Sequence, residues 1–324
     1  MRTWRTWSLV AALLLAAMLL MACEAEEDEA AEADPDDQPL AFDLEDLDEE
    51  PEEDPEEDPE EEDEVDEPEE DVDVEDAVAS YATTLPEGWF VESDTDAFAD
   101  GLEVDDAVLI DVREEDEFAD GHVPGAVNIP IREVPDRLEE IPTDQPVWIM
   151  CASGWRAGLV MSTLGILGYD NLTAYTPGSQ GWEADGRDLV DEPGEAPDAG
   201  DPGVDDELRE TVGDVLRTLP EGYLTNSLEE VQEAIDAGAQ LVDVREPDEY
   251  EDGFIEDAIS APLRETATAA QEDVPRDEPV IVYCQTGYRA SLGLAMYRAL
   301  GFDNAEGFPG SFAAWVEAGE AVTE

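Results

Sequence analysis

One sequence pattern occurs twice in the chain, and this duplication limits the possible folds more than any other feature. "VWIMCASGWRAG" begins at Val147 and "VIVYCQTGYRAS" begins at Val280, so Cys151 and Cys284 occupy the same place in the pattern. Other pairs, such as "TLPEGW" with "TLPEGY" and "LGYDN" with "LGFDN", match at offsets of 132 to 134 residues. A period of this length predicts two tandem domains rather than a solenoid of short repeats.

Each copy alternates short aliphatic runs with longer helical segments. Such runs, bounded by polar residues, are typical of buried parallel strands, and alternating strands and helices predict a parallel sheet covered by helices on both faces. The fold class is therefore α/β, with two such domains. The expected strands are Ala107–Val112, Val147–Met150, Gln240–Val244 and Val280–Tyr283, and the expected helices are Arg156–Leu167 and Arg289–Leu300.

The two cysteines each follow a predicted strand and precede a predicted helix. Ligand sites in parallel sheets form at the carboxyl ends of the strands. The short segments after Cys151 and Cys284 can curl around the sulfur, and their N–H groups with the positive helix end would bind an anion. Such surroundings favour the thiolate form of cysteine. The sequence thus predicts two reactive thiols.

At these residues the chain resembles the rhodanese family of sulfurtransferases. The resemblance rests on "DVRE" at Asp111 and Asp243, on "GHVPGAVNIP" from Gly121, on the two C-x-x-G-x-R loops and on the "PGS…W" ends. It covers about two-thirds of the chain, roughly 77–186 and 204–319. The family implies a cysteine that accepts sulfane sulfur as a persulfide and passes it to a thiophilic acceptor.

Carried over to this chain, the resemblance makes Cys151 and Cys284 the nucleophiles. The remaining loop residues would cradle the sulfur and the oxygen atoms of the substrate, with Arg156 and Arg289 either donating to an anionic substrate or bracing the loop. No cofactor or metal is implied. The expected substrate-binding residues are Ala152, Ser153, Gly154, Trp155 and Arg156 in the first loop and Gln285, Thr286, Gly287, Tyr288 and Arg289 in the second.

Several departures and alternatives stay open at this point. Family members whose loop is one residue longer act on phosphate or arsenate, but both loops here have the shorter length. Many tandem relatives keep only the second cysteine, whereas this chain has both. The domains could instead serve as a non-catalytic binding or sulfur-carrier module, or Cys151 and Cys284 could form a disulfide. The second copy also replaces "GHVPGA" by "GFIEDA", and its "PGSFAAW" is one residue longer than "PGSQGW".

Some residues beside the loops have structural interpretations. Asp111 with Arg113 and Asp243 with Arg245 are expected to form internal ion pairs, and the sole histidine, His122, is expected to be structural. Two aromatic residues within the loops, Trp155 and Tyr288, could gate the substrate pocket or be exposed. Trp182 and Trp315 are expected in the core.

The charge balance is strongly acidic. The chain has 90 Asp and Glu residues against 14 basic residues, all of them arginine, for a formal net charge of −76. This surface would repel nucleic acid and anionic donors such as thiosulfate at low salt. Because the screening length falls to about 3 Å in molar salt, we expect a protein adapted to high salt.

The N-terminus resembles a lipoprotein signal. Arg2 and Arg5 precede the apolar run Leu9–Ala22, which is short for a membrane span and suits a signal peptide. Cys23 follows this run, as in a lipobox, and would be lipidated. We therefore expect an exported protein held by a lipid anchor in the cell envelope, on the outer face of the cytoplasmic membrane.

The expected partners of the protein are a small sulfur-containing anion, a thiol or cyanide acceptor and, through the anchor, the membrane, but not nucleic acid; the oligomeric state stays open.

The chain is expected to have five segments. The segment after the signal is too acidic and too poor in apolar residues to fold. The segments are a signal peptide (1–22), an acidic spacer (23–76), a first domain (77–186), a linker (187–203) and a second domain (204–324).

Overall fold

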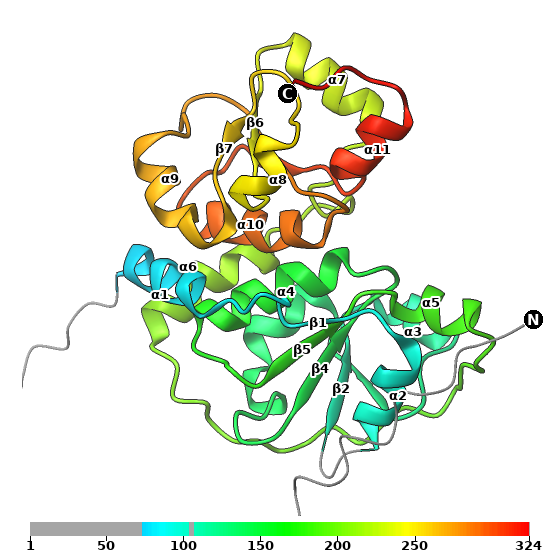
Figure 1. The fold of residues 1–324 in the computed structure, drawn as a ribbon. Helices are drawn as coiled ribbons and strands as arrows, with labels where there is room; N and C mark the ends of the chain where they lie inside the picture. Colours follow the sequence, from blue (N-terminus) through cyan, green and yellow to red (C-terminus); the bar gives the residue numbers. More distant parts are fainter. Residues whose placement is uncertain (1–72, 104–106, 324) are drawn as a thin grey trace, which may run out of the picture. The chain divides into compact units, whose positions relative to one another are not determined.

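Five short strands, all parallel, form one sheet in the first half of the chain (Figure 1). The computed structural model describes residues 73–103 and 107–323, and we call 73–203 the first half and 204–323 the second half. The strand order is β1-β5-β4-β2-β3, and Leu109 of β2 lies opposite Trp148 of β4. The strands are β1 (Val91–Glu92), β2 (Val108–Asp111), β3 (Ala126–Asn128), β4 (Val147–Met150) and β5 (Leu172–Tyr175).

The second half repeats this arrangement with four parallel strands. Their order is β7-β6-β8-β9, and Leu241 of β6 lies opposite Ile281 of β8. A single parallel bridge from Thr225 to Gly307 takes the place that β1 has in the first sheet. The strands are β6 (Gln240–Asp243), β7 (Ile259–Ser260), β8 (Val280–Tyr283) and β9 (Ala305–Gly307).

Helices surround both sheets, so the predicted α/β class with two parallel sheets is confirmed. The predicted helices after the cysteines begin and end one residue earlier than expected, as α4 (Trp155–Ile166) and α10 (Tyr288–Ala299). The other helices of the first half are α2 (Thr95–Leu102), α3 (Glu115–Ala119), η1 (Ile131–Asp136), η2 (Leu138–Glu140) and α5 (Gly178–Ala184). Those of the second half are α7 (Leu228–Asp236), α8 (Pro247–Glu251), η3 (Leu263–Glu265), α9 (Thr266–Glu272) and α11 (Ser311–Glu317).

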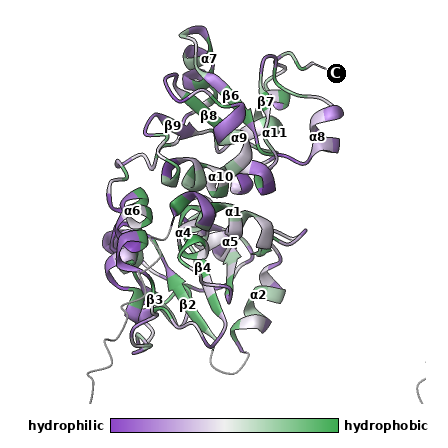
Figure 2. Cartoon of the chain, turned by 90° about the vertical axis from the view of Figure 1, so that its left-hand side faces the viewer, coloured by the Kyte–Doolittle hydropathy of each residue, from purple (hydrophilic) through white to green (hydrophobic). Residues whose placement is uncertain are grey.

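The core is built on the apolar strands and on the two helices that follow the cysteines. In Figure 2 strand β2 is hydrophobic, whereas α7 is largely hydrophilic. Nearly every residue of α4 is buried, because this helix packs on its own sheet and also against α10. A side chain at Gly158 would place its Cβ 1.9 Å from the Oγ of Ser291, so the close approach of the two helices depends on this glycine.

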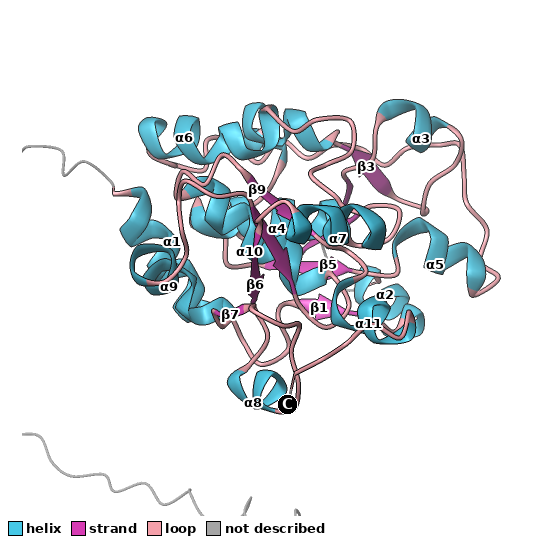
Figure 3. Cartoon of the chain, turned by 90° about the horizontal axis from the view of Figure 1, so that it is seen from above, coloured by secondary structure: helices cyan, strands magenta, loops and turns pink. Residues whose placement is uncertain are grey.

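Two helices pack across the halves. Helix α1 (Val74–Thr84) contacts α9 and η3 of the second half as well as α4, and Figure 3 shows it beside α9. Helix α6 (Asp206–Arg217) belongs to the second half in sequence but packs on η1 and α4. Its Arg209 donates from Nε to the carbonyl oxygen of Pro135 at 2.9 Å. The two halves therefore share one core, and the described residues 73–103 and 107–323 belong to one compact unit.

The boundaries of the domains differ in detail from the expected segments. Helix α1 begins at Val74, with the Asp73 carboxylate accepting from the amide of Glu75, so the helix includes three residues assigned to the spacer. The 187–203 linker lies along the first half, where Val190 pairs with His122 and Gly194 donates to Ala126. The signal peptide, Cys23 and the spacer up to residue 72 lie outside the described residues.

Among the described helices, none has the length and apolar character needed to cross a membrane. Within 73–103 and 107–323, no group of His, Cys, Asp or Glu side chains is arranged to hold a metal ion.

Candidate active sites

Each repeated cysteine lies directly after a central strand. Cys151 follows β4 and Cys284 follows β8, and both thiols are free and about 1% exposed. The parallel register of each sheet brings these strand ends to the same edge as the ends of β2 and β6. The alternative of a disulfide between Cys151 and Cys284 is not what the structure shows.

The short loop after each cysteine curls back onto the sulfur. The amide of Gly154 donates to the Sγ of Cys151 at 3.1 Å, and the amide of Gly287 donates to the Sγ of Cys284 at the same distance. Both glycines precede the first residue of a helix and have φ of 92° and 108°. An N–H donor and the N-terminal end of a helix therefore lie beside each sulfur.

The two sulfur atoms differ in one neighbour. The Oγ of Ser311 lies 3.8 Å from the Sγ of Cys284 and accepts from the Cys284 amide at 3.1 Å. The backbone amides of Ser179 and Phe312 donate to the carbonyl oxygens of Cys151 and Cys284, so these two residues are equivalent. The residue before each of them is Gly178 in the first half and Ser311 in the second. Among the described side chains, a hydroxyl group contacts the sulfur at the second site only. Ser311 was not among the predicted site residues, although the extra residue in "PGSFAAW" marks the difference between the two sites.

The loop arginines are held in ion pairs. Nη2 of Arg156 donates to Oε1 of Glu117 at 2.7 Å while its Nη1 contacts the other carboxylate oxygen, and Arg289 pairs with Glu249 at 2.5 and 2.7 Å. The hydrogen bond from Arg156 lowers the pKa of Glu117 despite partial burial. Burial opposes the charge of Arg156, but the bond to Glu117 and the nearby Cys151 raise the pKa of its guanidinium above the usual value.

These pairs bear on the role that the sequence left open for the arginines. Because both terminal nitrogens of each guanidinium bind one carboxylate, Arg156 holds its loop against helix α3 and Arg289 holds its loop against helix α8. The glutamates went unnoticed in the sequence, because Glu117 and Glu249 stand among several other acidic residues.

A second set of ion pairs fixes the loops that follow β2 and β6. Arg113 pairs with Asp111 at 2.7 Å and Arg245 with Asp243 at 2.6 Å, and all four side chains are buried. Each arginine also donates to a backbone carbonyl eight residues later, at Gly121 and Gly253. The prediction of internal ion pairs is confirmed.

The remaining interpretations can be placed in the same way. His122 is buried, with Nδ1 3.1 Å from the carbonyl oxygen of Phe118, in agreement with a structural role. Trp182 and Trp315 are buried in the two cores, as expected. Trp155 is buried and Tyr288 is half-buried, so neither is exposed, and both lie in the wall of a cavity between the two loops. Both reach the other half, where they donate to the carbonyl oxygens of Tyr223 at 3.0 Å and Trp89 at 3.3 Å.

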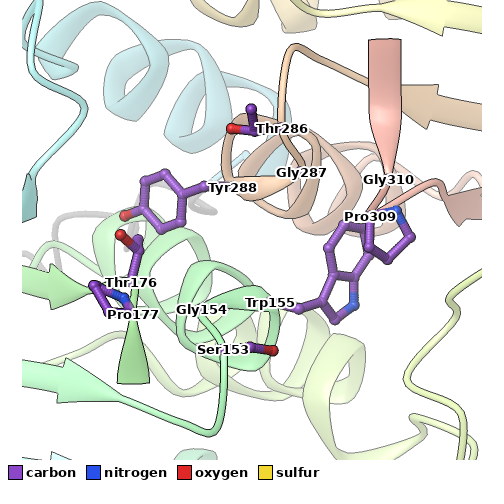
Figure 4. Close-up of a pocket in the computed structure, with 10 residues that line it drawn as sticks. All are labelled: Ser153, Gly154, Trp155, Thr176, Pro177, Thr286, Gly287, Tyr288, Pro309 and Gly310. Atoms are coloured by element: carbon purple, nitrogen blue, oxygen red, sulfur yellow. The ribbon is translucent and has the colours of Figure 1, made fainter. Parts of the chain in front are cut away.

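A cavity of about 540 Å³ lies between the two loops (Figure 4). It brings together Ser153, Gly154 and Trp155 from the first predicted set with Thr286, Gly287 and Tyr288 from the second. A larger hollow of about 850 Å³ includes Gln285, Thr286 and Arg289 together with Trp89 from the first half. Ala152 is half-buried and its carbonyl oxygen accepts from the amide of Gln180.

Comparison with known proteins agrees with this geometry. The family model described as "Rhodanese-like domain" matches residues 94–185 and 227–318, together more than half of the chain. A protein named "Sulfurtransferase" from Allochromatium vinosum is 32% identical over 100 residues, which are 31% of this chain and 94% of that protein.

Two Bacillus subtilis relatives match over a smaller part of their length. YrkF is 32% identical over 92 residues, which are 28% of this chain, and YqhL is 48% identical over 58 residues, which are 18% of this chain. The chain spans about half the length of these two proteins, 50% and 46% respectively. With both cysteine loops in matched segments, the chain belongs to the rhodanese-like family and carries two rhodanese-like domains in tandem.

Proposed function

We propose that the chain is an exported sulfurtransferase that carries sulfane sulfur on Cys151 and Cys284 as persulfides. The observation that carries the proposal is the amide hydrogen bond to each sulfur, 3.1 Å long, at the N-terminus of a helix. A thiol in such a place is poised to act as a nucleophilic thiolate. The duplication of this arrangement supports two sites.

The reaction would proceed in two displacements. The cysteine thiolate attacks the outer sulfur of a donor such as thiosulfate, a new S–S bond forms, and the bond to the sulfonate breaks with release of sulfite. A thiophilic acceptor such as cyanide or a thiolate then attacks the outer sulfur of the persulfide. That S–S bond breaks, the cysteine thiolate is regenerated, and thiocyanate or a new persulfide leaves.

The loop residues would stabilise the anionic forms of this cycle. The Gly154 and Gly287 amides donate to the sulfur, and the helix dipoles of α4 and α10 add positive potential. Arg156 and Arg289 add positive charge while they remain tied to their glutamates. In the second site the Ser311 hydroxyl is a further polar neighbour of the sulfur.

We extend the proposal to location. Arg2 and Arg5, the apolar run to Ala22 and the lipobox-like Cys23 support export and attachment through a lipid on Cys23. Labelling cells with a radioactive fatty acid tests this attachment. The label should appear in the wild-type chain and be lost in Cys23→Ser; equal labelling of both would exclude Cys23 as the anchor.

The sulfur transfer is tested with the full chain in detergent and molar KCl. Wild type, Cys151→Ser, Cys284→Ser and the double variant are assayed for thiosulfate:cyanide turnover, and each is weighed after thiosulfate treatment. We expect one added sulfur for each intact cysteine and no turnover in the double variant. Sulfur addition without turnover would make the protein a sulfur carrier, and turnover in the double variant would refute the mechanism.

A further inference from the structure

The repeated "TLPEGW" and "TLPEGY" segments have no role in the mechanism above, yet each contacts the cysteine site of the other half. Arg264, in η3 of the second half, donates to the carbonyl oxygens of Leu85 at 3.1 Å and Pro86 at 2.8 Å. Arg132, in η1 of the first half, donates to the carbonyl oxygens of Leu219 and Pro220 at 2.9 and 2.8 Å. The exchange is reciprocal, with equivalent atoms on both sides.

The last residue of each segment is aromatic and lies against the arginine of the other half's cysteine loop. The guanidinium of Arg289 is 5.4 Å from the ring centre of Trp89, and that of Arg264 is 4.2 Å away. In the first half, the guanidinium of Arg156 lies 4.9 Å from the ring centre of Tyr223. These distances are within the range of cation–π attraction.

The backbone at these aromatic residues is strained in both segments. Trp89 and Phe90 have φ of 56° and 52°, and Tyr223 and Leu224 have φ of 50° and 57°. Each left-handed non-glycine residue costs roughly 1–3 kcal/mol and persists only where its surroundings impose it. The same two strained positions in both copies indicate that the direction of the aromatic side chain matters.

The hollow beside Cys284 shows what these side chains form. Its wall combines Leu85, Glu87 and Trp89 of the first half with Gln285, Thr286 and Arg289, which are loop residues of the second half. A substrate that approaches this loop would therefore meet the indole of Trp89. The two walls also differ in polarity, since the Tyr223 hydroxyl donates to Glu114 at 2.8 Å and accepts from Arg156 at 3.2 Å.

We propose that each half supplies the aromatic wall of the other half's cysteine site, and that Trp89 and Tyr223 determine substrate specificity at Cys284 and Cys151 respectively. The inference rests on the proposed sulfur transfer for its catalytic part. The indole is an apolar surface among the mostly charged residues that line the hollow beside Cys284, whereas the hydrogen-bonded phenol presents a hydroxyl group beside the Cys151 loop. The two sites then differ in the acceptors that they prefer.

The first test does not require sulfur transfer. The full chain in detergent and molar KCl is treated with iodoacetamide, and alkylation of each cysteine is followed by peptide mass spectrometry. Trp89→Ala should change the alkylation rate of Cys284 by about twofold to thirtyfold, the range that corresponds to loss of one cation–π contact, and leave Cys151 unchanged. Tyr223→Ala should affect Cys151 and leave Cys284 unchanged.

The crossed pattern has its control in each molecule, because the cysteine of the same half reports general loosening. Effects on the same-half cysteine, equal effects on both cysteines, or no effect would each overturn the proposal. If an alanine variant does not fold, Trp89→Phe and Tyr223→Phe replace it, since both keep a ring; Tyr223→Phe should still alter Cys151 alone, through loss of the hydroxyl.

The second test measures specificity in single-cysteine backgrounds. In the chain with only Cys284, Trp89→Tyr should shift the ratio of kcat/KM for cyanide and glutathione towards that of the Cys151 site, and Tyr223→Trp should do the reverse with only Cys151. If the aromatic residue had only a structural role, the variant would lower kcat/KM for both acceptors equally. The unchanged ratio would refute the specificity assignment. Absence of turnover in both single-cysteine chains with wild-type Trp89 and Tyr223 would refute the proposed function. The alkylation pattern would still test whether each aromatic side chain acts on the cysteine site of the other half.

Discussion

Nη2 of Arg289 donates to Oε1 of Glu249 at 2.7 Å, and Nη1 of the same arginine contacts the other carboxylate oxygen at 2.5 Å. The pair joins the first turn of α10 to helix α8, so that the loop around Cys284 is fixed at both ends. Arg156 and Glu117 form the same link in the first half.

This link makes part of the stability depend on pH. The hydrogen bond from Arg289 lowers the pKa of Glu249 in the folded protein, although partial burial opposes the shift. A carboxyl group with a lowered folded pKa stabilises the fold above its unfolded pKa of about 4.3. That contribution is lost as the pH falls through the lower folded value. Glu249→Gln should therefore be less stable than wild type at pH 7, and the difference should shrink below about pH 4.

Urea unfolding in molar KCl, followed by circular dichroism at a series of pH values, measures this difference. Glu251→Gln on the same helix is the matched control, because Glu251 is exposed and has no ion pair among the described residues. A constant gap between wild type and Glu249→Gln across the acidic range would show that the ion pair is not the source.

The hydroxyl of Ser311 should make the two cysteines unequal. Ser311→Ala removes the oxygen that lies 3.8 Å from the Cys284 sulfur and that accepts from the Cys284 amide. The same hydroxyl donates to the carbonyl oxygen of Phe308 at 2.7 Å, and each buried hydrogen bond of this kind contributes about 0.5–1.5 kcal/mol. We expect alkylation of Cys284 at pH 7 to slow by about twofold to tenfold, with Cys151 unchanged.

Ser179→Ala is the control, since Ser179 lies beside the Cys151 loop and contributes its backbone amide, not its hydroxyl, to the Cys151 carbonyl. Iodoacetamide kinetics resolved by peptide measure both cysteines in one sample. If alkylation of Cys284 slowed equally in Ser311→Ala and Ser179→Ala, a specific role for the Ser311 hydroxyl would be contradicted.

Local patterns in the sequence were enough to predict the two sheets and the place of the cysteines. The aliphatic runs gave β4 and β8 with the observed ends, because a strand buried on both faces has few polar residues. The packing of α1 and α6 across the halves was not predicted. An amphipathic pattern shows that a helix has a buried face but not which surface covers it.

The missed site residues have related causes. In a chain so rich in acids, nothing local distinguishes Glu249 from Asp248 or Glu251, and only the fold brings it to Arg289. Trp89 and Tyr223 were recognised as ends of a repeated segment. Their contacts with the opposite cysteine loops are long-range, however, and depend on how the halves share one core.

The tight turn after Cys151 should not tolerate a side chain at Gly154. This residue has φ of 92°, and an added Cβ would lie 2.8 Å from the carbonyl oxygen of Thr176. Gly154→Ala should lower the free energy of unfolding by roughly 1–3 kcal/mol and displace the amide that donates to the Cys151 sulfur. Alkylation of Cys151 should fall while that of Cys284 is retained.

Gly168→Ala separates backbone strain from the steric clash. Gly168 has a similar φ of 96°, but an added Cβ there would meet no atom within 4 Å. Chemical denaturation and alkylation are measured for both variants. Gly168→Ala should show only the strain cost of roughly 1–2 kcal/mol and normal reactivity of Cys151; equal losses in the two variants would argue against the clash with Thr176.

The acidic composition predicts that folding itself requires salt. At a formal net charge of −76, with arginine as the only basic side chain besides one histidine, carboxylates repel one another across the surface. Molar KCl shortens the screening length to about 3 Å, so helical content and thiosulfate:cyanide turnover should rise together from dilute buffer to molar KCl. Circular dichroism and turnover assays across a KCl series measure both.

Sucrose provides the control for that experiment. It strengthens burial of apolar surface without screening charge, so sucrose alone should restore less structure in dilute buffer than KCl does. Buried pairs such as Arg245 with Asp243 are screened much less than exposed charges and should survive the salt. Full structure in dilute buffer would exclude the adaptation to salt, but it would leave the two cysteine sites and their chemistry unaffected.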